Sequence, residues 1–390
     1  MLPPRVCRCH DFWGECVVAV PLRQAIRVGA YVLGKHLKGV RRYPLVLMLE
    51  PLFRCNLACA GCGKIDYPDA ILNQRLSVDE CLDAVGECGA PVVVLAGGEP
   101  LLHREIDTIV ARLIARKKFV YLCTNALLLQ RKIELFSPST YFAWTVHLDG
   151  DRDDHDRSVC QEGVYDRAIA AIKLAKARGF RVNINATLFD TAKPERVAQF
   201  FDEITRIGID GITVSPGYAY ERAPDQEHFL NRRRTKELFR DIFKRGARRW
   251  SFNQSMLFLD FLAGNQSYHC TPWGNPTRNF FGWQRPCYLL GESYAKTFRE
   301  LMDETDWDAY GTGNYEKCAN CMVHSGYEAT AVMDSVSNPL KLAKLALRGI
   351  CTEGEMAPEI ALHRQRPARY VFSSHVEEAM ARLGVSDKRA

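Results

Sequence analysis

The sequence has no long apolar run. Its longest apolar segments, such as Cys16 to Val20 and Val92 to Leu95, fall far short of the roughly 20 residues that a membrane-spanning helix needs. The first residues also lack the basic start, long apolar stretch and small-residue cleavage site of a secretory leader. We therefore expect a protein without a spanning helix that works in the cytoplasm.

Large blocks of one charge are also scarce. The formal net charge is +6, and basic residues alternate with acids along most of the chain, so nucleic acid is not an expected partner. The exception is Pro21 to Arg42, which has no acid and six basic residues: Arg23, Arg27, Lys35, Lys38, Arg41 and Arg42. The same segment carries an apolar helical face formed by Ile26, Ala30, Leu33 and Leu37. This combination is typical of a helix lying on the inner face of a membrane, although a helix that closes one end of the fold fits it equally.

Cysteine, by contrast, is frequent, with 15 in 390 residues. Without an export signal we expect a reducing compartment, where clustered cysteines serve metals or redox chemistry more often than disulfides. Cys7, Cys9 and Cys16 are either a metal site or part of an unstructured leader, and the leader is the favoured interpretation. We assign residues 1–42 to this leader and the basic amphipathic helix.

Residues 43–220 alternate short apolar segments with helix-like segments, as repeated βα units do. The expected strands are Leu45–Leu49, Val92–Leu95, Phe119–Cys123, Phe142–Leu148, Val182–Thr187 and Gly211–Ser215. The expected helices between them are Ser77–Glu87, Glu105–Arg116, Leu128–Phe136, Tyr165–Arg178 and Pro194–Arg206. Six such units predict an α/β fold with a partial (βα)6 barrel of the TIM type, in which functional residues follow the strands.

The character of the sequence changes after residue 220. A basic helical stretch, Arg232–Arg249, leads into an aromatic, glycine-rich section. We predict a smaller C-terminal substrate or cap module over residues 221–335 and a helical tail over residues 336–390. The module bears a second cysteine group, formed by Cys270, Cys287, Cys318 and Cys321. These four thiols either ligate an auxiliary iron-sulfur cluster, bind zinc, or pack without a metal.

The motif richest in chemistry follows the first strand, where Cys55, Cys59 and Cys62 stand at C-x3-C-x2-C spacing. Three thiolates on one short loop can wrap one face of an iron-sulfur cubane, because soft sulfur ligands suit such clusters. Three ligands leave one iron open, and an open coordination site marks a place where a substrate or cofactor binds. A zinc site completed by a distant residue, or three packed thiols, would use the same residues.

Three further motifs stand at strand ends. Gly97-Gly98-Glu99-Pro100 follows the second strand, Thr124-Asn125 the third, and His147-Leu-Asp149-Gly150 the fourth. Each alone is an ordinary turn. Together with the three-cysteine loop, and in this order, they make a specific signature.

From about Leu45 to Pro216 the sequence resembles the radical S-adenosylmethionine (SAM) superfamily. The resemblance implies a [4Fe-4S] cluster on Cys55, Cys59 and Cys62, with SAM on the open iron. It also implies SAM contacts at the strand ends, formed by Gly97, Gly98, Glu99, Pro100, Asn125, Asp149 and Asn185. Two departures are Gly61, where many members carry an aromatic residue just before the third cysteine, and the stretch His155 to Val159, which lacks the later arginine often found in related members. Adenine stacking and carboxylate binding must therefore be supplied differently.

From about Ala19 to Glu328 the chain resembles the adenosylhopane synthase family of hopanoid biosynthesis. The likeness lies in Pro21 to Arg27, Leu57 to Asp69, Trp144 to Gly150, Gly274 to Arg278 and Cys318 to Tyr327. It implies transfer of the 5'-deoxyadenosyl group to the alkene of the hopene diploptene, with an electron donor such as a flavodoxin or ferredoxin. The alternatives are a radical SAM enzyme that abstracts hydrogen from a peptide or nucleotide, and a non-catalytic iron-sulfur or zinc protein.

Addition to an alkene leaves a carbon radical that must gain a hydrogen atom. A thiol is a suitable donor because its S–H bond is weaker than the C–H bond that forms. Cys123 ends the third strand beside Thr124-Asn125, so we expect it at the mouth of the barrel. A buried packing cysteine is an equally good interpretation of this position.

Overall fold

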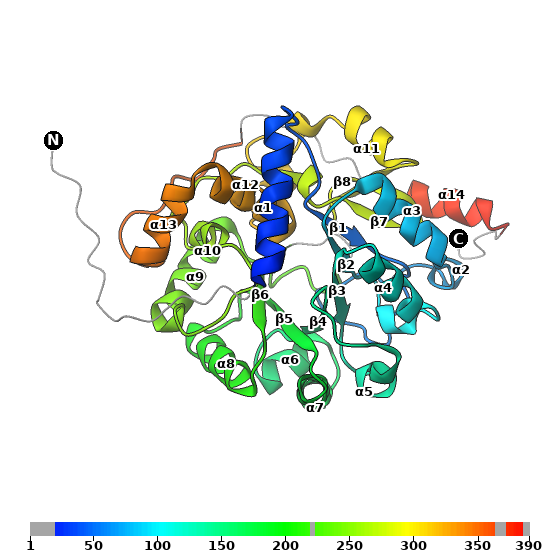
Figure 1. The fold of residues 1–390 in the computed structure, drawn as a ribbon, viewed down its shortest axis with the longest axis horizontal. Coiled ribbons are helices and arrows are strands. Elements are labelled where there is room, and N and C mark those ends of the chain that lie inside the picture. Colours follow the sequence, from blue (N-terminus) through cyan, green and yellow to red (C-terminus); the bar gives the residue numbers. More distant parts are fainter. Residues whose placement is uncertain (1–19, 219–222, 363–371, 385–390) are drawn as a thin grey trace.

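The computed structural model describes residues 20–218, 223–362 and 372–384 (Figure 1). The predicted leader, residues 1–18 with Cys7, Cys9 and Cys16, lies outside these ranges. Within them, no helix has both the length and the apolar character needed to cross a bilayer.

Six parallel strands form the centre of the molecule, arranged in sequential order. They are β1 (Val46–Leu49), β2 (Val92–Leu95), β3 (Phe119–Thr124), β4 (Phe142–His147), β5 (Arg181–Leu188) and β6 (Gly211–Pro216). Each begins and ends within one residue of its predicted bounds. Pairing in register, for example of Met48 with Val94, keeps the inward side chains of neighbouring strands level. The predicted α/β fold with a mostly parallel sheet is confirmed.

Helices connect these strands and cover the outer face of the sheet (Figure 1). They are α2 (Asp69–Leu72), α3 (Val78–Cys88), η1 (Pro100–Leu102), α4 (Ile106–Ala115), α5 (Leu129–Lys132), η2 (Ile133–Leu135), α6 (Arg152–Ser158), α7 (Val164–Ala177) and α8 (Pro194–Ile207). Outward strand residues such as Leu47, Val93 and Trp144 bury themselves against the helices and form the main core. α3 starts at a capping box, in which Ser77 and Glu80 each accept the other's backbone N–H.

The second half of the chain extends the same sheet. β7 (Thr277–Asn279) pairs in parallel with β1, and β8 (Gly282–Pro286) and β9 (Gly291–Ala295) add antiparallel strands beyond it. The helices here are α9 (Arg232–Gly246), α10 (Met256–Leu262), η3 (Pro272–Gly274), α11 (Phe298–Glu304), η4 (Trp307–Ala309), η5 (Glu316–Cys318) and α12 (His324–Ser337). Residues 221–335 are thus joined to the first half by strand pairing, and the boundary predicted at residue 335 falls inside α12.

Three more helices complete the fold: α1 (Leu22–Leu37), α13 (Pro339–Arg348) and α14 (Phe372–Arg382). α1 has the predicted bounds and lies across the N-terminal ends of the strands, beside α12 (Figure 1). The Tyr121 hydroxyl, near the start of β3, donates a hydrogen bond to Gln24 at 2.8 Å. Val32 is buried in a small apolar cluster with Tyr43 and Leu45. α1 therefore closes the end of the sheet opposite to the predicted functional loops.

Candidate functional site

The six parallel strands curve around one cavity of about 890 Å³. Side chains from every one of these strands line it, among them Met48, Cys123 and Ser215. The three-cysteine loop and the predicted strand-end motifs surround its upper end, at the C-terminal ends of the strands. Its lower end is largely apolar and is lined by Val28, Val46, Val92, Val332, Val336 and Leu342. One cavity thus connects the predicted cofactor residues to an apolar chamber above α1, α12 and α13.

Cys55, Cys59 and Cys62 all line the upper end of this cavity and form no disulfide. Burial raises the pKa of each thiol, to about 11 for Cys55. Backbone N–H groups of Leu57 and Lys64 point to the sulfurs of Cys55 and Cys62 and oppose this rise. Buried sulfurs that accept N–H hydrogen bonds suit thiolate ligands of a metal cluster, which replaces the protons when it binds.

The spacing of these sulfurs distinguishes between the metals proposed for the loop. A tetrahedral zinc ion holds its sulfur ligands about 2.3 Å away, and therefore roughly 3.8 Å from one another. In the described part of the chain, the only three metal-ligating groups with all ligand atoms within 4.8 Å are His147, Asp149 and His155, so the three sulfurs are spread more widely. The loop fits a cubane, whose irons are separate ligand sites, better than a single zinc ion.

The glycine pair Gly97-Gly98 packs its turn against the chain that leads into the cysteine loop. A Cβ atom on Gly97, where φ is +114°, would lie 2.3 Å from the Leu52 carbonyl oxygen. A Cβ atom on Gly98 would lie 2.2 Å from the carbonyl oxygens of Phe53 and Arg54. Both glycines line the cavity, but the close backbone approach that demands glycine is to this chain segment. These contacts hold the start of the cysteine loop in position.

Glu99 links the end of β2 to the end of β3. One carboxylate oxygen accepts hydrogen bonds from the Leu101 N–H at 3.0 Å and the Thr124 hydroxyl at 2.9 Å, and the other accepts the Asn125 N–H at 2.8 Å. Burial raises the pKa of Glu99 to about 7 in spite of these three donors. A carboxylate has about four acceptor positions, so one remains for a ligand in the cavity.

Asn125 follows β3 and lies against the cysteine loop. Its side-chain NH2 donates to the Asn56 carbonyl oxygen at 2.8 Å and lies 3.8 Å from the Cys55 sulfur. Pro100 begins η1 and is buried, and it is not among the residues that line the cavity. Asn185, on β5, does line it.

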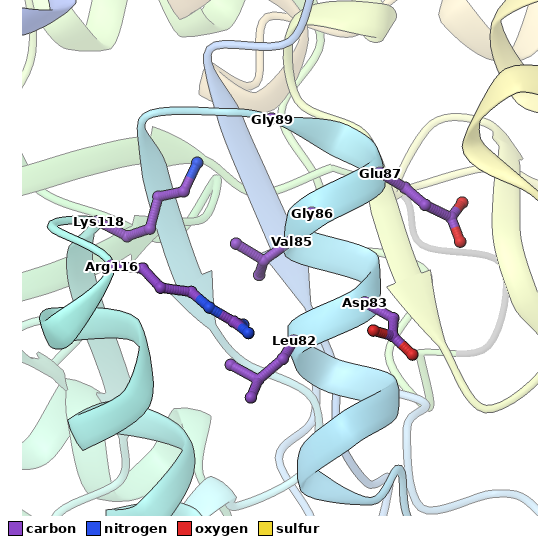
Figure 2. Close-up of a pocket in the computed structure, with 8 residues that line it drawn as sticks. All are labelled: Leu82, Asp83, Val85, Gly86, Glu87, Gly89, Arg116 and Lys118. Atoms are coloured by element: carbon purple, nitrogen blue, oxygen red, sulfur yellow. The ribbon is translucent and has the colours of Figure 1, made fainter.

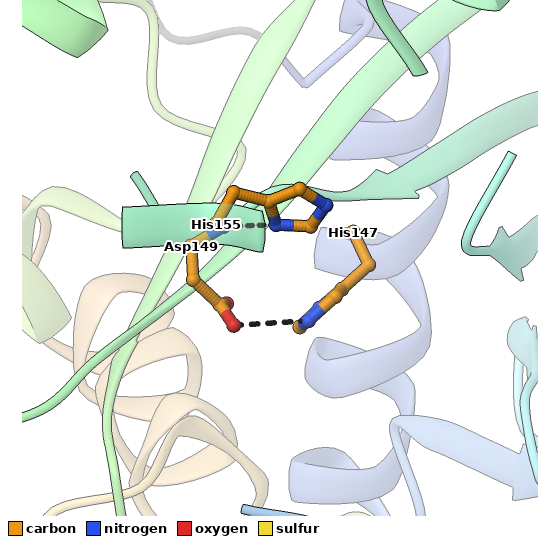
Figure 3. Close-up of side chains that lie close together, drawn as sticks. All are labelled: His147, Asp149 and His155. Carbon is orange, nitrogen blue, oxygen red and sulfur yellow. Dashed lines mark hydrogen bonds and ion pairs between the residues drawn. The ribbon is translucent and has the colours of Figure 1, made fainter. Parts of the chain in front are cut away.

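Asp149 contacts two histidines, His147 and His155 (Figure 3). Its carboxylate accepts the Thr187 N–H at 2.9 Å and the Ser158 hydroxyl at 2.8 Å, and lies 3.0 Å from His147 Nε2. Although burial favours the neutral forms, this ion pair keeps the pKa of Asp149 below its usual range and that of His147 above it. Burial lowers the pKa of His155 to about 4, and its Nδ1 accepts the Asp149 N–H. Asp149 is therefore a fixed anion at the cavity wall.

An aromatic residue that the sequence analysis missed, Phe189, stands next to the cysteine loop. It directly follows β5 and lines the cavity. A Cβ atom on Gly61 would come within 2.9 Å of the Phe189 ring, and one on Gly217 within 2.7 Å. Gly61, where the family resemblance leads one to expect an aromatic side chain, thus leaves room for a ring that follows another strand. The signal that the sequence offered for Phe189 was its position directly after a strand.

A second feature missed from sequence is the buried ion pair of Lys64 and Glu50. The Lys64 ammonium lies 2.9 Å from a Glu50 carboxylate oxygen, and both side chains are almost fully buried. Asn279 of β7 donates to the same carboxylate at 3.2 Å. Among the described residues that line the cavity, Lys64 is the only lysine or arginine. The Lys64 side chain therefore places a positive charge two residues after Cys62 in the sequence.

Cys123 faces the cavity from β3. Burial raises the pKa of its thiol to about 12, with a smaller contribution from the charge of Glu99. The group is therefore a neutral thiol throughout the neutral pH range. An S–H bond is thus present in the wall between the cofactor end and the apolar chamber.

Some inward side chains leave polar atoms without a protein partner. Thr145 Oγ1, Ser215 Oγ, His324 Nδ1 and Glu328 Oε2 are buried, line the cavity and have no hydrogen-bond partner. Burial raises the pKa of Glu328 to about 7 and lowers that of His324 to about 4. Such groups are satisfied by water or by polar parts of a ligand. The cavity is therefore amphipathic.

A second, shallower depression of about 550 Å³ lies on the outer layer, between α3 and the turn that enters β3 (Figure 2). Arg116 and Lys118 approach the side of α3 that carries Leu82 and Val85. No cysteine or histidine lines it, and it shares no residue with the central cavity. The central cavity is the candidate site.

Comparisons with known proteins divide the chain in two. Residues 49–204 match the family model of the radical SAM superfamily, and residues 212–345 match a domain of unknown function, DUF3463. GTP 3',8-cyclase of Clostridium perfringens (strain SM101 / Type A) is 28% identical over 163 residues, which is 40% of this chain and 50% of the relative. Pre-heme d1 synthase of Dinoroseobacter shibae is 24% identical over 189 residues, or 46% of each chain. The chain spans about half the length of these curated relatives.

Solved structures share the fold. SuiB of Streptococcus suis superposes with a TM-score of 0.54 at 20% identity, covering 78% of this chain and 76% of SuiB. The structure of anSMEcpe with bound AdoMet gives a TM-score of 0.51 at 18% identity and covers 78% of this chain and 100% of that one. Neither these structures nor the two curated relatives is named as a hopanoid enzyme, so the comparisons support the superfamily and leave the reaction open.

Proposed function

We propose that the protein cleaves SAM reductively and joins its 5'-deoxyadenosyl group to the alkene of the hopene diploptene, because residues 49–204 match the family model of the radical SAM superfamily. The superfamily implies a [4Fe-4S] cluster and SAM as cofactors. The observation that carries the proposal is the single cavity with three cysteines at one end and an apolar chamber at the other.

Cys55, Cys59 and Cys62 would hold three irons of the cluster and leave the fourth for the amino and carboxylate groups of SAM. When bound there, the cluster would supply one electron to the sulfonium, whose carbon–sulfur bond would break to give methionine and the 5'-deoxyadenosyl radical. The buried backbone donors to the cysteine sulfurs keep the loop ready for this ligand. Gly97 and Gly98 hold the loop in position, because their turn packs against the backbone just before Cys55.

The chain offers a partner for each polar part of SAM. Glu99 has a free acceptor position for the ammonium group, and Lys64 is the cation beside the loop for the carboxylate. Asp149, held as an anion, and Asn185 are placed to accept the ribose hydroxyls. The ring of Phe189 offers a face for adenine, which stacks well on aromatic side chains.

The apolar chamber supports a hydrocarbon substrate. Its lining of valines and leucines comes from β1, β2, α1, α12 and α13, and its volume lies in the usual range of ligand cavities, about 300–1,000 Å³. A hydrocarbon needs no hydrogen-bond partner and gains free energy by leaving water. The unpartnered polar atoms on β4 and β6 would face water or the adenosyl group.

Cys123 would complete the reaction. A new carbon–carbon bond between the 5' carbon and the terminal alkene carbon leaves an unpaired electron on the neighbouring carbon. The Cys123 S–H bond breaks, its hydrogen atom passes to that carbon, and a sulfur radical remains. One further electron and one proton restore the thiol, so each turnover consumes two electrons, drawn from a flavodoxin or ferredoxin.

The lower end of the cavity would face a membrane, from which a hopene must be drawn. The two helices α1 and α13, which line this end, also carry exposed apolar side chains, namely Leu22, Ile26, Leu33 and Leu37 of α1 and Leu340 and Leu347 of α13. Basic residues lie among them, including Arg23, Arg27, Lys35, Lys341 and Lys344. Apolar side chains mixed with basic ones suit an anionic lipid surface. We therefore place the protein in the cytoplasm, peripherally on the inner face of the membrane.

A second candidate function is hydrogen abstraction from a polar substrate such as a peptide or nucleotide. The buried polar atoms of Thr145, Ser215, His324 and Glu328 favour it, because a hydrocarbon leaves them without partners. Anaerobic incubation with SAM, reductant and diploptene separates the two. The proposal requires an adenosylated hopane by mass spectrometry, whereas free 5'-deoxyadenosine without adduct supports the second function.

A further inference from the structure

The second cysteine group converges in the fold. Cys270 precedes η3, Cys287 follows β8, and Cys318 and Cys321 flank the end of η5. A Cβ atom on Gly311 would lie 3.6 Å from Cys270 Cβ, and the Gly311 N–H points to the Cys318 sulfur. Cys287 packs against the same small cluster as Cys318, and the Cys321 N–H donates to the Cys318 carbonyl at 3.1 Å. Four thiols from three separate segments therefore share one buried place.

The surroundings of these sulfurs are built for thiolates. Backbone N–H groups of Leu289 and Leu290 point to the Cys287 sulfur, and that of Val323 points to the Cys321 sulfur. The Gly311 N–H points to the Cys318 sulfur. Hydrogen bonds to the ligand atoms are typical of the surroundings of a metal site. All four cysteines are free of disulfides.

A glycine, Gly326, leaves space for the Cys270 side chain. A Cβ atom on Gly326 would lie 2.7 Å from the Cys270 sulfur, so glycine is required there. The Thr271 N–H donates to the Gly326 carbonyl at 2.8 Å, which ties the Cys270 segment to the start of α12. The Cys270 sulfur thus lies close to the backbone of Gly326 at the edge of the apolar core.

A buried cation compensates the group. Arg232, at the start of α9, is only 6% exposed, and its guanidinium donates to the Cys321 carbonyl at 2.7 Å. Four thiolates around a cubane leave a net negative charge, and a buried guanidinium offsets it.

The spacing argues for a cluster rather than a single ion. No three of these four sulfurs lie within 4.8 Å of one another in the described structure. A zinc ion with four sulfur ligands would bring them to roughly 3.8 Å. We propose that Cys270, Cys287, Cys318 and Cys321 ligate a second [4Fe-4S] cluster, fully coordinated by the protein.

Full coordination fixes what this cluster can do. With four protein ligands it has no open iron, so it does not bind SAM or substrate. It lies directly behind the cavity wall, because Tyr288 and Val323, neighbours of two ligands, line the cavity. Tyr218 also lines it and donates from its hydroxyl to the Lys317 carbonyl, beside Cys318. The cluster therefore binds together three segments that form this wall.

Iron and acid-labile sulfide, measured after anaerobic reconstitution with iron and sulfide, test the proposal. The wild type should hold about eight of each per chain, as two [4Fe-4S] clusters require. The Cys55→Ala/Cys59→Ala/Cys62→Ala variant should keep about four, and so should Cys318→Ser/Cys321→Ser. The matched control, Cys81→Ala/Cys88→Ala, removes two buried thiols of α3 and should keep about eight.

The Cys55/Cys59/Cys62 variant keeps the test decisive even if the Cys318/Cys321 variant fails to fold. Loss of all iron from it would overturn the proposal, as would about four irons in the wild type together with one tightly bound zinc. Mössbauer spectra of the iron retained in that variant should show a cubane that SAM leaves unchanged. None of these readouts depends on the reaction that the first cluster performs.

Discussion

The ring of Phe189 lies beside Gly61, so close that a Cβ atom on the glycine would sit 2.9 Å from the ring. Phe189 follows β5, whereas Gly61 immediately precedes the third cysteine of the loop after β1. The contact joins the loop after β1 to a residue that follows β5, four strands away in the sheet. An aromatic ring from a distant strand thus lies beside the cysteine loop.

Replacing Phe189 with alanine should weaken SAM binding. Stacking of a base on an aromatic ring is worth about 1–3 kcal/mol, so we expect the Kd for SAM to rise roughly tenfold or more. Equilibrium binding to the reconstituted protein measures it. Phe189→Tyr keeps the ring and should bind nearly as the wild type does. Equal Kd values for the alanine variant and the wild type would remove Phe189 from the SAM site.

Replacing Cys123 with alanine should separate SAM cleavage from product formation. The variant keeps the cysteine loop, so 5'-deoxyadenosine or unreduced adduct should still form, while reduced adenosylhopane falls at least tenfold. In D2O the wild-type product should carry one deuterium, because the thiol hydrogen exchanges with solvent. Cys88→Ala, which removes a buried thiol of α3, is the matched control. An unchanged yield from the Cys123 variant would end this role.

Glu99 should make folding stability depend on pH. Burial raises its pKa from 4.5 to about 7 in the folded protein, so the folded state binds more protons than the unfolded state in that window. Stability therefore falls as pH rises from 4.5 to 7, and the loss is complete above about 7. Glu99→Gln removes this loss, which amounts to at most about 3 kcal/mol.

Urea unfolding of the metal-free proteins at pH 5 and pH 8 measures this effect. Relative to wild type, Glu99→Gln should be more stable at pH 8 than at pH 5. The buried carboxyl of Glu328, whose pKa is also raised to about 7, is present in both proteins and cancels in the comparison. A difference between variant and wild type that is the same at both pH values would contradict the account.

Charging the exposed face of α1 should release the protein from lipid. Ile26 and Leu33 are 62% and 52% exposed, and burying such a side chain in a bilayer contributes about 1.5–3 kcal/mol. We expect Ile26→Glu/Leu33→Glu to lower cosedimentation with anionic vesicles at least tenfold. Leu135→Glu, at a site 56% exposed in the outer helix layer, should bind as the wild type does. Wild-type protein that fails to bind vesicles with or without anionic lipid would refute the membrane surface.

The parallel half of the fold could be predicted because its signals are local. Apolar runs such as Val92–Leu95 are bounded by turn residues, and α3 starts at a capping box of its own. β7 could not be predicted, because three residues that pair with β1 across more than 200 positions leave no periodic pattern. The second half was therefore predicted as a separate module, although it continues the sheet.

The residues of the candidate site also fall into some that could be predicted from the sequence and some that could not. The cysteine loop was predicted because its spacing is local, and the sheet then brought Cys123 and Asp149 to the same cavity. Phe189 and the Lys64–Glu50 pair were missed, since single apolar or charged residues carry no pattern until folding buries them. The glycine pair was predicted to approach a ligand, whereas its tightest contacts are with the chain before Cys55.

Mössbauer spectroscopy of the 57Fe-reconstituted protein, recorded with and without SAM, tests the central claim most directly. A cubane held by Cys55, Cys59 and Cys62 has one iron without a protein ligand, so SAM should change the signal of one iron site. That response should vanish in the Cys55→Ala/Cys59→Ala/Cys62→Ala variant. Spectra that ignore SAM in the wild type, or a response that persists in the variant, would contradict the account.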